Sequence, residues 1–579
     1  MSYDSISIPQ SAIAQKLIDI KAASRLASGD ATLFGFSEEA EDFAKRFTGW
    51  TTLCTKPPYD PRKVMEFAEA ERGAGLEDVL IIGQGGSTQA SMTMASLLDN
   101  VGRLDIGFHT MDCLSPEFVR SVLDSINPAR TIVVVSSKSG TTIEPTMMFK
   151  CIWEEFVKAL GPEKAGKRFV AITDPGSQLE KTALQDGFAA VFPGEPTVGG
   201  RFSALSVFGL VPFALMGMDV CALVDYCAEA ERKCSLDSME NPALRLASYL
   251  KESVLRGRDK LSFNFSESCA ALGMWLEQLI AESTGKDGWG ILPNTESDVS
   301  LLQTHNSDRF AIAYTMECDR DRTWPDGTTQ NGEKSVASII DYIPIIEMTI
   351  DSPEDAARHF VVWEYAISMA SALLELNPFD QPDVESTKIE VRKILSGDHG
   401  KGVDAGDYMV FTRGEMVEGY EVSEILIKPG QQPRDLDDIL GVLFSSMKKG
   451  DYFSLNAFLP VDEERHQILE SMRHDVAKIS GCPACLEMGP RYLHSIGQYQ
   501  KGGKNRGVFL ILSSEEEDDI QIPGESFGLA YLASSQARGD FLALNMHMRR
   551  AAHIHLVNNS PDVLKRIAEK VRRHVPSRL

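Results

Sequence analysis

From residue 78 onward, short β-rich runs alternate with stretches of helical periodicity. Such alternation predicts a doubly wound parallel sheet, with helices on both of its faces. Ligands of these sheets bind at the carboxyl ends of the strands, in the loops that lead into the helices. We expect strands at 79–82, 131–136 and 169–172, and helices that end near 98, near 159 and near 184.

The same alternation continues along the chain and indicates several α/β units. The length of 579 residues is enough for more than one core. We expect a helical arm over 1–60 packed on a first domain over 61–230, a second domain over 231–396 and a C-terminal α/β region over 397–579. Further strands are expected at 261–265, 310–314, 342–350, 452–458, 508–512 and 554–557.

The net charge and the cysteine content exclude several classes of protein. The 58 Lys and Arg against 83 Asp and Glu give a net charge of −25, which disfavours nucleic-acid and membrane partners because these need a basic face. Ten cysteines with one CxxC pair, Cys482 and Cys485, fit reduced thiols better than disulfides or zinc. The first residues lack the features of a secretory signal, and Pro212 breaks the most apolar stretch, 204–218. We expect a cytoplasmic chain in which that stretch is a buried helix.

The first strand is followed by a glycine-rich loop, GQGGS, at 83–87. Main-chain amides in such a loop can approach an anion closely, which makes Gly86 and Ser87 candidates for phosphate or sugar binding. The dinucleotide fingerprint would need glycine at Thr88, and the P-loop pattern would need Gly-Lys-Ser/Thr, so neither nucleotide motif is present. A tight turn without a ligand remains the alternative.

The second strand is followed by SSKSGTTIEP, at 136–145. Its hydroxyls lie between a buried strand and the start of a helix, where free amides and the helix dipole favour a phosphate. Thr141 and Glu144 have the spacing of a capping box, so part of this polarity could serve the helix alone. A capping box would not explain the other polar residues of this loop. We therefore take four of them as candidates for phosphate binding: Ser137, Lys138, Ser139 and Thr142.

Four further residues have both a functional and an ordinary interpretation. Glu282 is expected near the end of a helix that stops at Gly285, where burial and the negative end of the dipole would raise its pKa toward that of a general base. An exposed last-turn glutamate is the alternative. Arg201 follows two glycines and is either a positioned cation or a surface residue, and Lys388, seven residues after Gln381, could simply lie on a helix surface.

Several of these motifs together resemble one family. SKSGTT, the GGRFS of 199–203, QLIAESTGK at 278–286 and NPFDQPDVESTK at 377–388 are similar to the phosphoglucose isomerase family, which is built on paired sugar-isomerase domains. GPRYLHSIGQYQKGG at 489–503 resembles the isomerase half of transaldolase–phosphoglucose isomerase fusion proteins. The isomerase-like part occupies the whole length, so we expect no transaldolase domain here.

The resemblance implies an activity and a role for each candidate. It implies reversible isomerisation of glucose 6-phosphate and fructose 6-phosphate without a cofactor or a metal. Glu282 would move the proton between C1 and C2, Arg201 would stabilise the cis-enediolate, and Gln381 would contact the sugar. Lys388 would take part in ring opening with a histidine, which we assign to His494 because His305 and His359 lack the matching surroundings.

Two other functions share parts of this pattern. A non-catalytic regulator that senses sugar phosphates would need only the hydroxyl loop, and the presence of Glu282, Arg201 and His494 argues against it. Glucosamine-6-phosphate synthase would need an amidotransferase domain with an N-terminal cysteine, whereas Ser2 follows the first methionine. For partners we expect a hexose 6-phosphate; a homodimer and a functional link to a transaldolase are open hypotheses.

The remaining features have ordinary interpretations. His553 and His555 alternate on one face of an expected strand with His547 nearby, which is a weak metal signal. The acidic run 515–519 is interpreted as a solvated loop. Trp275 and Phe202 are expected in the core.

Overall fold

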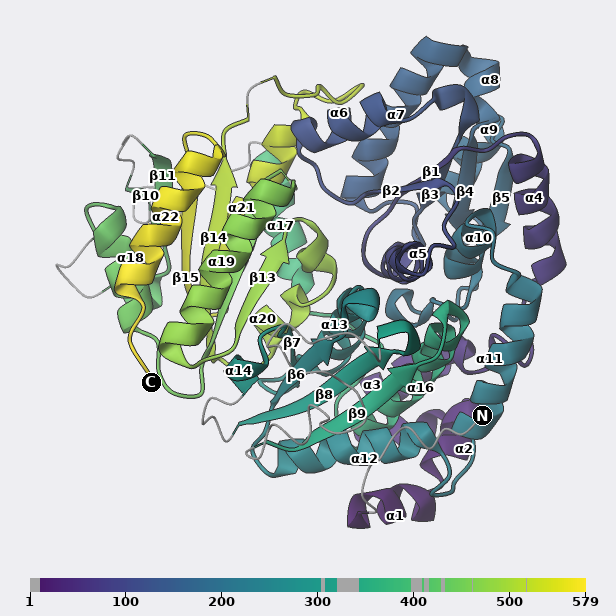
Figure 1. The fold of residues 1–579 in the computed structure, drawn as a ribbon, viewed down its shortest axis with the longest axis horizontal. Coiled ribbons are helices and arrows are strands. Elements are labelled where there is room, and N and C mark those ends of the chain that lie inside the picture. Colours follow the sequence, from purple (N-terminus) through teal and green to yellow (C-terminus); the bar gives the residue numbers. More distant parts are fainter. Residues whose placement is uncertain are drawn as a thin grey trace.

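The computed structural model describes residues 11–302, 308–319, 343–396, 409–410, 416–427, 433–460, 462–516 and 518–579. Three sheets form its framework, and helix α13 lies near the middle, between them (Figure 1). The fold is α/β, as the alternation predicts. No helix in the described part of the chain is long and apolar enough to cross a membrane.

The first sheet is entirely parallel, in the order β2-β1-β3-β4-β5. Alternate side chains of its central strands are buried on opposite faces, against α4, α5 and α10 on one side and α6, α7 and α9 on the other. The strands are β1 (Asp78–Ile82), β2 (Gly107–Met111), β3 (Thr131–Ser136), β4 (Phe169–Thr173) and β5 (Ala190–Pro193). The helices are α4 (Pro61–Gly73), α5 (Gln89–Asn100), α6 (Pro116–Ser125), α7 (Ile143–Leu160), α8 (Pro162–Gly166), α9 (Gln178–Gln185) and α10 (Val207–Leu215).

The second sheet is also parallel, in the order β7-β6-β8-β9. Its apolar face shares one continuous core with the first sheet. The strands are β6 (Lys260–Phe265), β7 (Leu292–Thr295), β8 (Arg309–Met316) and β9 (Ile345–Ile350). The helices are α11 (Val220–Cys234), α12 (Pro242–Leu255), α13 (Leu272–Thr284), α14 (Val299–Leu302), α16 (Pro353–Leu374) and α17 (Val384–Leu395).

The third sheet mixes directions, in the order β10-β11-β15-β14-β12-β13. β10 and β11 are antiparallel to their neighbours, and the other pairs are parallel. The strands are β10 (Met409–Val410), β11 (Val417–Val422), β12 (Tyr452–Phe458), β13 (Ala484–Met488), β14 (Gly507–Ser514) and β15 (Arg550–Leu556). The helices are α18 (Leu436–Ser445), α19 (Glu463–Ser480), α20 (Gly497–Gly502), α21 (Leu529–Met546) and α22 (Pro561–His574).

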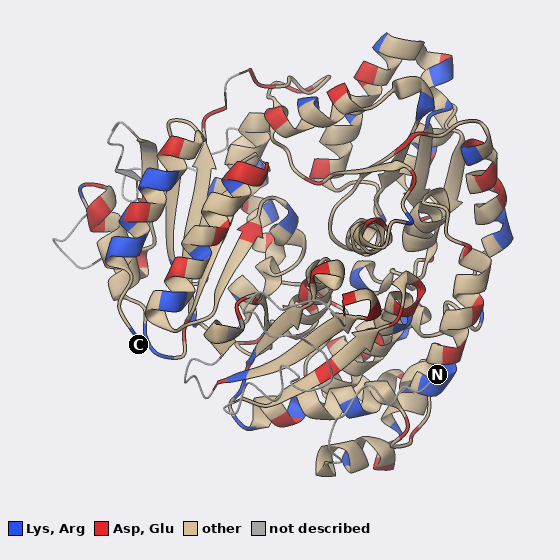
Figure 2. Ribbon diagram, viewed as in Figure 1, with Lys and Arg blue, Asp and Glu red and all other residues tan. Residues whose placement is uncertain are grey.

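Acidic and basic residues are interspersed along the outer helices α19 and α22 (Figure 2). Lys565 of α22 pairs with Glu464 of α19 at 3.0 Å, with both side chains more than half exposed. Exposed pairs contribute little to stability. The apolar residues beneath them, such as Leu469 and Leu564, are fully buried and hold these helices on the third sheet.

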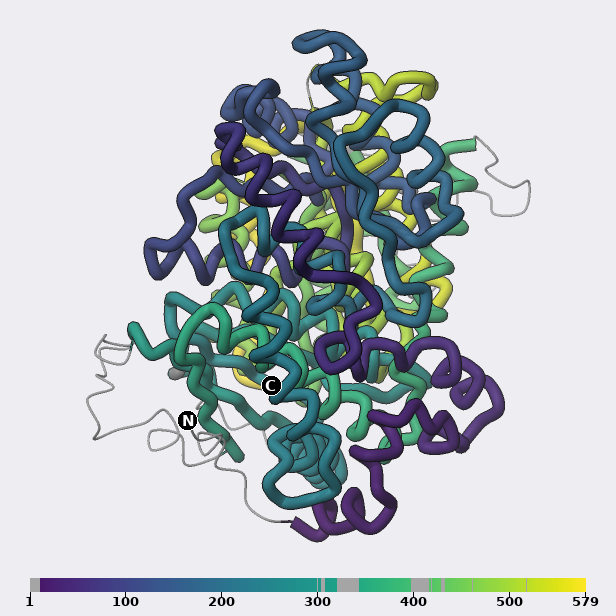
Figure 3. The backbone as a smooth tube through the Cα atoms, turned by 90° about the vertical axis from the view of Figure 1, so that its right-hand side faces the viewer, coloured from purple at the N-terminus to yellow at the C-terminus, as the bar shows by residue number. Residues whose placement is uncertain are grey.

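The N-terminal arm packs on two units, and not on the first alone as expected. It comprises α1 (Ala12–Asp19), α2 (Ala22–Ala27) and α3 (Glu38–Phe47). α1 packs on α12 and α2 on α16, both of which belong to the second unit, and the arm crosses the lower part of the molecule in Figure 3. Its continuation reaches the first unit through Trp50, whose ring stacks on Phe202 at 4.9 Å. The buried residues are Ala14 and Leu17 of α1 and Ala22, Ala23 and Leu26 of α2. Helical periodicity alone does not reveal which unit such a face packs on.

Each expected strand is present, although Tyr342, at the start of the expected strand 342–350, lies outside the described residues. Strands β2, β5, β7, β10, β11 and β13 were not expected. β2 and β5 are half-exposed edge strands, so they lack the apolar runs that identify the central ones. The stretch around Pro212 is the buried helix α10, and Trp275 and Phe202 lie in the core, as expected. The four-unit boundaries stay a proposal.

The acidic run 515–519 is not a simple solvated loop. The Glu516 carboxylate accepts a hydrogen bond from Ser115 at 2.9 Å, and Asp519 accepts one from the amide of Ala530 at 2.8 Å. Burial raises the pKa of Glu516 to about 7. The interpretation from charge alone was wrong for these two residues, because Glu516 docks on Ser115 of the first unit and Asp519 bonds to the start of α21.

The histidines of β15 are paired with protein groups. His553 bonds to Glu421 at 3.0 Å and to the hydroxyl of Ser513 at 2.8 Å, while His555 bonds to Ser513 and Glu515. Within the described residues, no group of three or more His, Cys, Asp or Glu side chains is arranged to hold a metal ion. All ten cysteines are free thiols.

Candidate active site

A cavity of about 330 Å³ lies where the three units meet, at the carboxyl ends of strands β1 and β3. All eleven residues singled out from the sequence line it: Gly86, Ser87, Ser137, Lys138, Ser139, Thr142, Arg201, Glu282, Gln381, Lys388 and His494. A volume of this size suits a small molecule. The cavity therefore brings the sequence-based candidates together, but they differ in burial and in hydrogen-bond partners.

The hydroxyl loop joins β3 to α7. Ser137 is 5% exposed, and its hydroxyl has no hydrogen-bond partner among the described residues. Ser139 accepts a hydrogen bond from the amide of Thr141 at 3.2 Å, while Thr142 occupies the N-cap position of α7 without capping it through its side chain. Unused hydroxyls and the positive end of an 18-residue helix thus face the cavity.

The capping-box interpretation of this loop is wrong. The helix begins at Ile143, so Thr142 rather than Thr141 is its N-cap residue. Glu144, at the second helical position, turns away from the helix start and bonds instead to His494 and Gln536. Its carboxylate serves the cavity wall and not the local backbone.

Lys138 lies at the cavity but is already neutralised. Its ammonium is 2.6 Å from a carboxylate oxygen of Asp174 and also donates to the carbonyls of Glu195 and Pro196. Between this residue and the helix, Gly140 has φ +66°, and a Cβ there would lie 2.9 Å from the amide nitrogen of Leu179. Lys138 therefore ties the loop to its neighbours more than it supplies a free charge.

The glycines of the first loop let separate segments come together. A Cβ on Gly86 would lie 2.0 Å from the carbonyl oxygen of Gly200, next to Arg201. Gly85 has φ +55°, and a Cβ there would lie 2.9 Å from the carbonyl oxygen of His494. These positions need glycine because the loop is pressed against two other walls of the cavity.

Glu282 lies in the last turn of α13, and only 7% of it is exposed. One carboxylate oxygen, Oε2, accepts hydrogen bonds from Arg201 at 3.2 Å and from Gln278 at 3.3 Å. Burial raises the pKa of this carboxyl, although the charges of Arg201 and His494 oppose the shift. The alternative of an exposed last-turn glutamate is therefore wrong, and the group has the surroundings of a general base.

Arg201 is a positioned cation and not a surface residue. It is 5% exposed, and besides Glu282 it donates to the side-chain oxygen of Gln381 at 3.1 Å. It also donates to the hydroxyl of Ser283 and to carbonyl oxygens of the loop 377–381. Every nitrogen of its guanidinium thus has an acceptor, which fixes the plane of the group beside Glu282.

Lys388 stays at the edge of the cavity. Its side chain is 42% exposed, and its ammonium pairs with Glu385, one turn earlier on α17, at 2.5 Å. The ordinary interpretation as a helix-surface lysine describes this position well, even though the residue lines the cavity.

His494 reaches the cavity from a short 3-10 helix, η10 (Arg491–His494), that follows β13. Its Nε2 lies 3.0 Å from an oxygen of Glu144, and Gln278 of α13 donates to its carbonyl at 2.9 Å. Gln278 thus links the segments that carry His494 and Glu282, more than two hundred residues apart in the chain.

Glu144 is the functional residue that the sequence analysis missed. It is 4% exposed and accepts hydrogen bonds from Gln536 and from the His494 ring. Burial alone would raise its pKa, but the charge and hydrogen bond of His494 outweigh this, and the pKa is lowered. The ionised carboxylate of Glu144 holds Nε2 of the His494 ring, so Nδ1 remains available to contact a ligand in the cavity. The sequence did contain a clue: Glu144 is a glutamate near a helix start, and a capping box does not explain its position.

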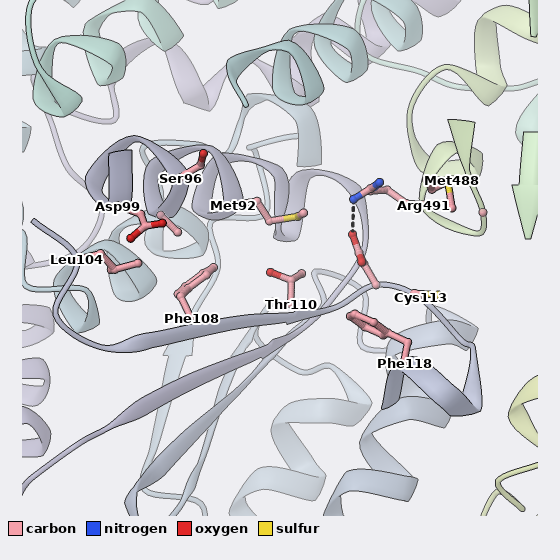
Figure 4. Close-up of a pocket in the computed structure, with 13 residues that line it drawn as sticks. Met92, Ser96, Asp99, Leu104, Phe108, Thr110, Cys113, Phe118, Met488 and Arg491 are labelled. Atoms are coloured by element: carbon pink, nitrogen blue, oxygen red, sulfur yellow. Dashed lines mark hydrogen bonds and ion pairs between the residues drawn. The ribbon is translucent and has the colours of Figure 1, made fainter. Parts of the chain in front are cut away.

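An ion pair holds η10, the turn that carries His494, against the first sheet. Arg491, at the start of η10, lies 3.3 Å from Asp112, which follows β2, and the two meet at one end of a second cavity of about 420 Å³ (Figure 4). The main-chain carbonyl of Asp112 accepts a hydrogen bond from Gln84 at 3.0 Å. The glycine loop and the histidine turn are therefore fixed to the same edge of the first sheet.

Residues 67–290, which include the hydroxyl loop, Arg201 and Glu282, match the family model described as phosphoglucose isomerase. Residues 67–290 thus form a phosphoglucose isomerase domain, and the chain is similar to glucose-6-phosphate isomerases over a longer stretch. It is 27% identical over 395 residues to a glucose-6-phosphate isomerase of Acholeplasma laidlawii, covering 60% of this chain and 90% of that protein. It is 29% identical over 392 residues to one from Staphylococcus saprophyticus, covering 60% and 87%.

Two solved structures share the fold of this chain over about two thirds of its length. A hypothetical protein from Thermus thermophilus is 25% identical, with a TM-score of 0.54, covering 67% of this chain and 100% of that one. A glucose-6-phosphate isomerase from Chlamydia trachomatis is 18% identical, with a TM-score of 0.52 over 69% of this chain and 89% of its own, and shows the fold alone.

Proposed function

We propose that this protein is a glucose-6-phosphate isomerase, which interconverts glucose 6-phosphate and fructose 6-phosphate. The observation that carries the proposal is the buried pair of Glu282 and Arg201 in the same cavity as a loop of unused hydroxyls. Relatives named glucose-6-phosphate isomerase support it. Nothing in the site favours the regulator, which would not need a buried carboxylate beside a fixed guanidinium.

The phosphate of the substrate would bind at the start of α7. The hydroxyls of Ser137, Ser139 and Thr142 face the cavity there, and Ser87 and the amide of Gly86 come from the adjoining loop. Because Asp174 already neutralises Lys138, binding would depend on hydroxyls, amides and the helix dipole.

Ring opening would use His494. Glu144 holds Nε2, so Nδ1 is the nitrogen available to move a proton at the ring oxygen of the sugar. Lys388 would assist from the rim, after exchanging its pairing with Glu385 for the substrate. The proton leaves the C1 hydroxyl as the ring oxygen gains one, which yields the open-chain aldose.

Proton transfer at carbon would use Glu282. Oε2 is held by Arg201 and Gln278, whereas Oε1 has no hydrogen-bond partner among the described residues and is the atom we assign as the base. It takes the proton from C2 of the aldose, a C1–C2 double bond forms, and negative charge develops on O1 of the enediolate. Arg201 stabilises that charge while the proton of the C2 hydroxyl passes to O1, and Glu282 then returns its proton to C1 as the C2 carbonyl forms to give the ketose.

A coupled assay tests this function directly. Fructose 6-phosphate is supplied in the presence of EDTA, and glucose 6-phosphate is followed through a dehydrogenase that reduces a nicotinamide coenzyme. We expect turnover without added metal or cofactor. Tight binding of fructose 6-phosphate with no product would favour the regulator instead.

The cellular setting also belongs to the proposal. We place the protein in the cytoplasm, where its hexose phosphate substrates occur, as a homodimer with a functional link to a transaldolase. Sedimentation of the purified chain tests the dimer, and copurification with a transaldolase from the native cells tests the link.

A further inference from the structure

Lys286 is a buried cation beside the proposed active site that the isomerase mechanism does not use. It follows Gly285, which ends α13, and lies four residues after Glu282. Its side chain is 3% exposed. A buried lysine needs acceptors for its three N–H groups, so its partners indicate what it does.

The hydrogen bonds of Lys286 all go to the loop that follows α16. The ammonium lies 2.5 Å from the carbonyl oxygen of Asn377, 2.7 Å from the carbonyl oxygen of Asp380 and 2.5 Å from a carboxylate oxygen of Asp380. This loop, 377–381, ends at Gln381, which contacts Arg201. Lys286 therefore holds the loop at two points from beneath.

Arg201 binds the same loop. Its guanidinium donates to the carbonyl oxygen of Pro378 at 3.1 Å and to the carbonyl oxygen of Asp380 at 2.8 Å. The Asp380 carbonyl thus accepts hydrogen bonds from Arg201 and Lys286 together. Any movement of the loop that breaks the contacts of Lys286 also moves the acceptors that fix the plane of Arg201.

We propose that Lys286 is a positioning residue for Arg201: it holds the 377–381 loop whose carbonyls orient the guanidinium, and it occupies the Asp380 carboxylate. The second role follows from charge. If the Lys286 ammonium is removed, the Asp380 carboxylate loses its buried cation. Because Asp380 already contacts Arg201 through its carbonyl, its carboxylate would then compete for the guanidinium. Arg201 would then turn from the enediolate position toward Asp380. This inference rests on the proposed isomerase function.

The electrostatics of the cluster fit this arrangement. Burial and the nearby charge of Arg201 lower the pKa of Lys286 to about 8, while Asp380 and Glu282 oppose the shift. Two cations and two carboxylates therefore share a small buried region. Removing one member changes the balance for the other three.

The test compares four proteins: the wild type, Lys286→Met, Asp380→Asn and the double variant. Lys286→Met should lower kcat by about 10- to 100-fold with KM changed by less than about threefold, because a displaced guanidinium weakens the transition state more than ground-state binding. Inhibition by inorganic phosphate should be unchanged, since the hydroxyl loop is not touched. Adding Asp380→Asn should restore at least about threefold of the lost kcat by removing the competing carboxylate.

Lys260→Met is the matched control. Lys260 is equally buried and lies 2.9 Å from Asp259 and 2.7 Å from Asp308. Among the described residues, none of its side-chain bonds reaches Arg201 or the loop. It should lower the unfolding temperature while leaving kcat within about twofold. A kcat loss in Lys260→Met as large as in Lys286→Met, or a double variant no better than Lys286→Met, would overturn the proposal.

Hydrogen–deuterium exchange separates this inference from the function itself. Amides of 377–381 should exchange faster in Lys286→Met than in the wild type, whether or not the chain isomerises sugars. Unchanged exchange in that loop would contradict the positioning role. Faster exchange in a protein without isomerase activity would leave the positioning intact and remove the proposed function.

Discussion

The phosphate-side loops and the His494 turn reach the same cavity by different routes. The loops at 83–87 and 136–142 each come directly after a strand of the first sheet, so strand, loop and helix are consecutive in the sequence. His494 and Gln381 reach the cavity only because the second and third units pack against the first. The phosphate side of the site, the local side, is thus built from residues close together in the sequence. The side that carries His494 and Gln381, the assembled side, forms only when distant parts of the chain pack together.

This difference implies different sensitivities. Changes at the local side should affect substrate binding, because the hydroxyls act one by one on a group that does not react. Changes at the assembled side should affect turnover, because Glu282, Arg201 and His494 must keep their mutual geometry. Substitutions on the two sides should therefore separate KM from kcat.

Glu282→Gln has the largest expected effect. The amide keeps the size of the side chain but cannot accept the proton from carbon, so kcat should fall by about 10²- to 10⁴-fold while fructose 6-phosphate still binds. Steady-state kinetics and a titration of binding measure the two quantities. Turnover near the wild-type rate would remove Glu282 from the reaction.

Glu144→Gln should come next, with a loss of about 10- to 100-fold in kcat on cyclic substrates. The neutral amide no longer stabilises the proton that His494 carries during ring opening. The loss should be much smaller for an open-chain aldose phosphate such as erythrose 4-phosphate, provided that the cavity accepts it. Equal losses on both substrates would assign Glu144 to structure alone.

Ser139→Ala should act on the local side with a smaller effect. Loss of one hydroxyl that faces the phosphate should raise KM by roughly three- to tenfold, with kcat little changed. Inhibition by inorganic phosphate should weaken by the same factor. Ser121→Ala, which removes a hydroxyl of α6 that donates to the carbonyl of Phe118 and does not line the cavity, serves as the control. A fall in kcat at constant KM would reverse the contrast between the two sides.

The pH dependence should separate two buried carboxylates with opposite shifts. The pKa of Glu282 is raised above the usual 4.5, so the acidic limb of kcat/KM should lie above pH 4.5 and disappear in Glu282→Gln. The folded state binds more protons there than the unfolded state, so the contribution of Glu282 to stability falls as pH rises through the window between the two pKa values.

Glu144 has the opposite sign. Its folded pKa lies below 4.5, so its contribution to stability is present above pH 4.5 and is lost as pH falls through the folded pKa. Unfolding temperatures of Glu144→Gln and Glu282→Gln, measured from pH 3 to pH 8, should therefore diverge from the wild type in opposite directions. Parallel curves would contradict the assigned shifts.

The same division explains what the sequence could predict. The central strands β1, β3 and β4 are buried on both faces and have the apolar runs that identify them, so the loops that follow them were predictable. Edge strands such as β2, with its half-exposed residues, carry no such pattern.

Contacts between units could be found only through resemblance or not at all. His494 was assigned by the motif around it, because no periodicity brings residue 494 to a loop at 136–142. The partnership of Glu144 with His494 and Gln536 was missed since the three residues share no local pattern. The packing of α1 and α2 on α12 and α16 was not expected for the same reason.

A structure with fructose 6-phosphate bound tests the central claim most directly, because the claim is that both sides act on one substrate molecule. We predict the phosphate within about 3 Å of the hydroxyls of Ser137–Thr142 and the amides at the start of α7, with Glu282 at C1 and C2 and His494 at the ring oxygen. A phosphate bound beside a lysine cluster elsewhere, or a His494 ring more than about 10 Å from the sugar, would contradict it.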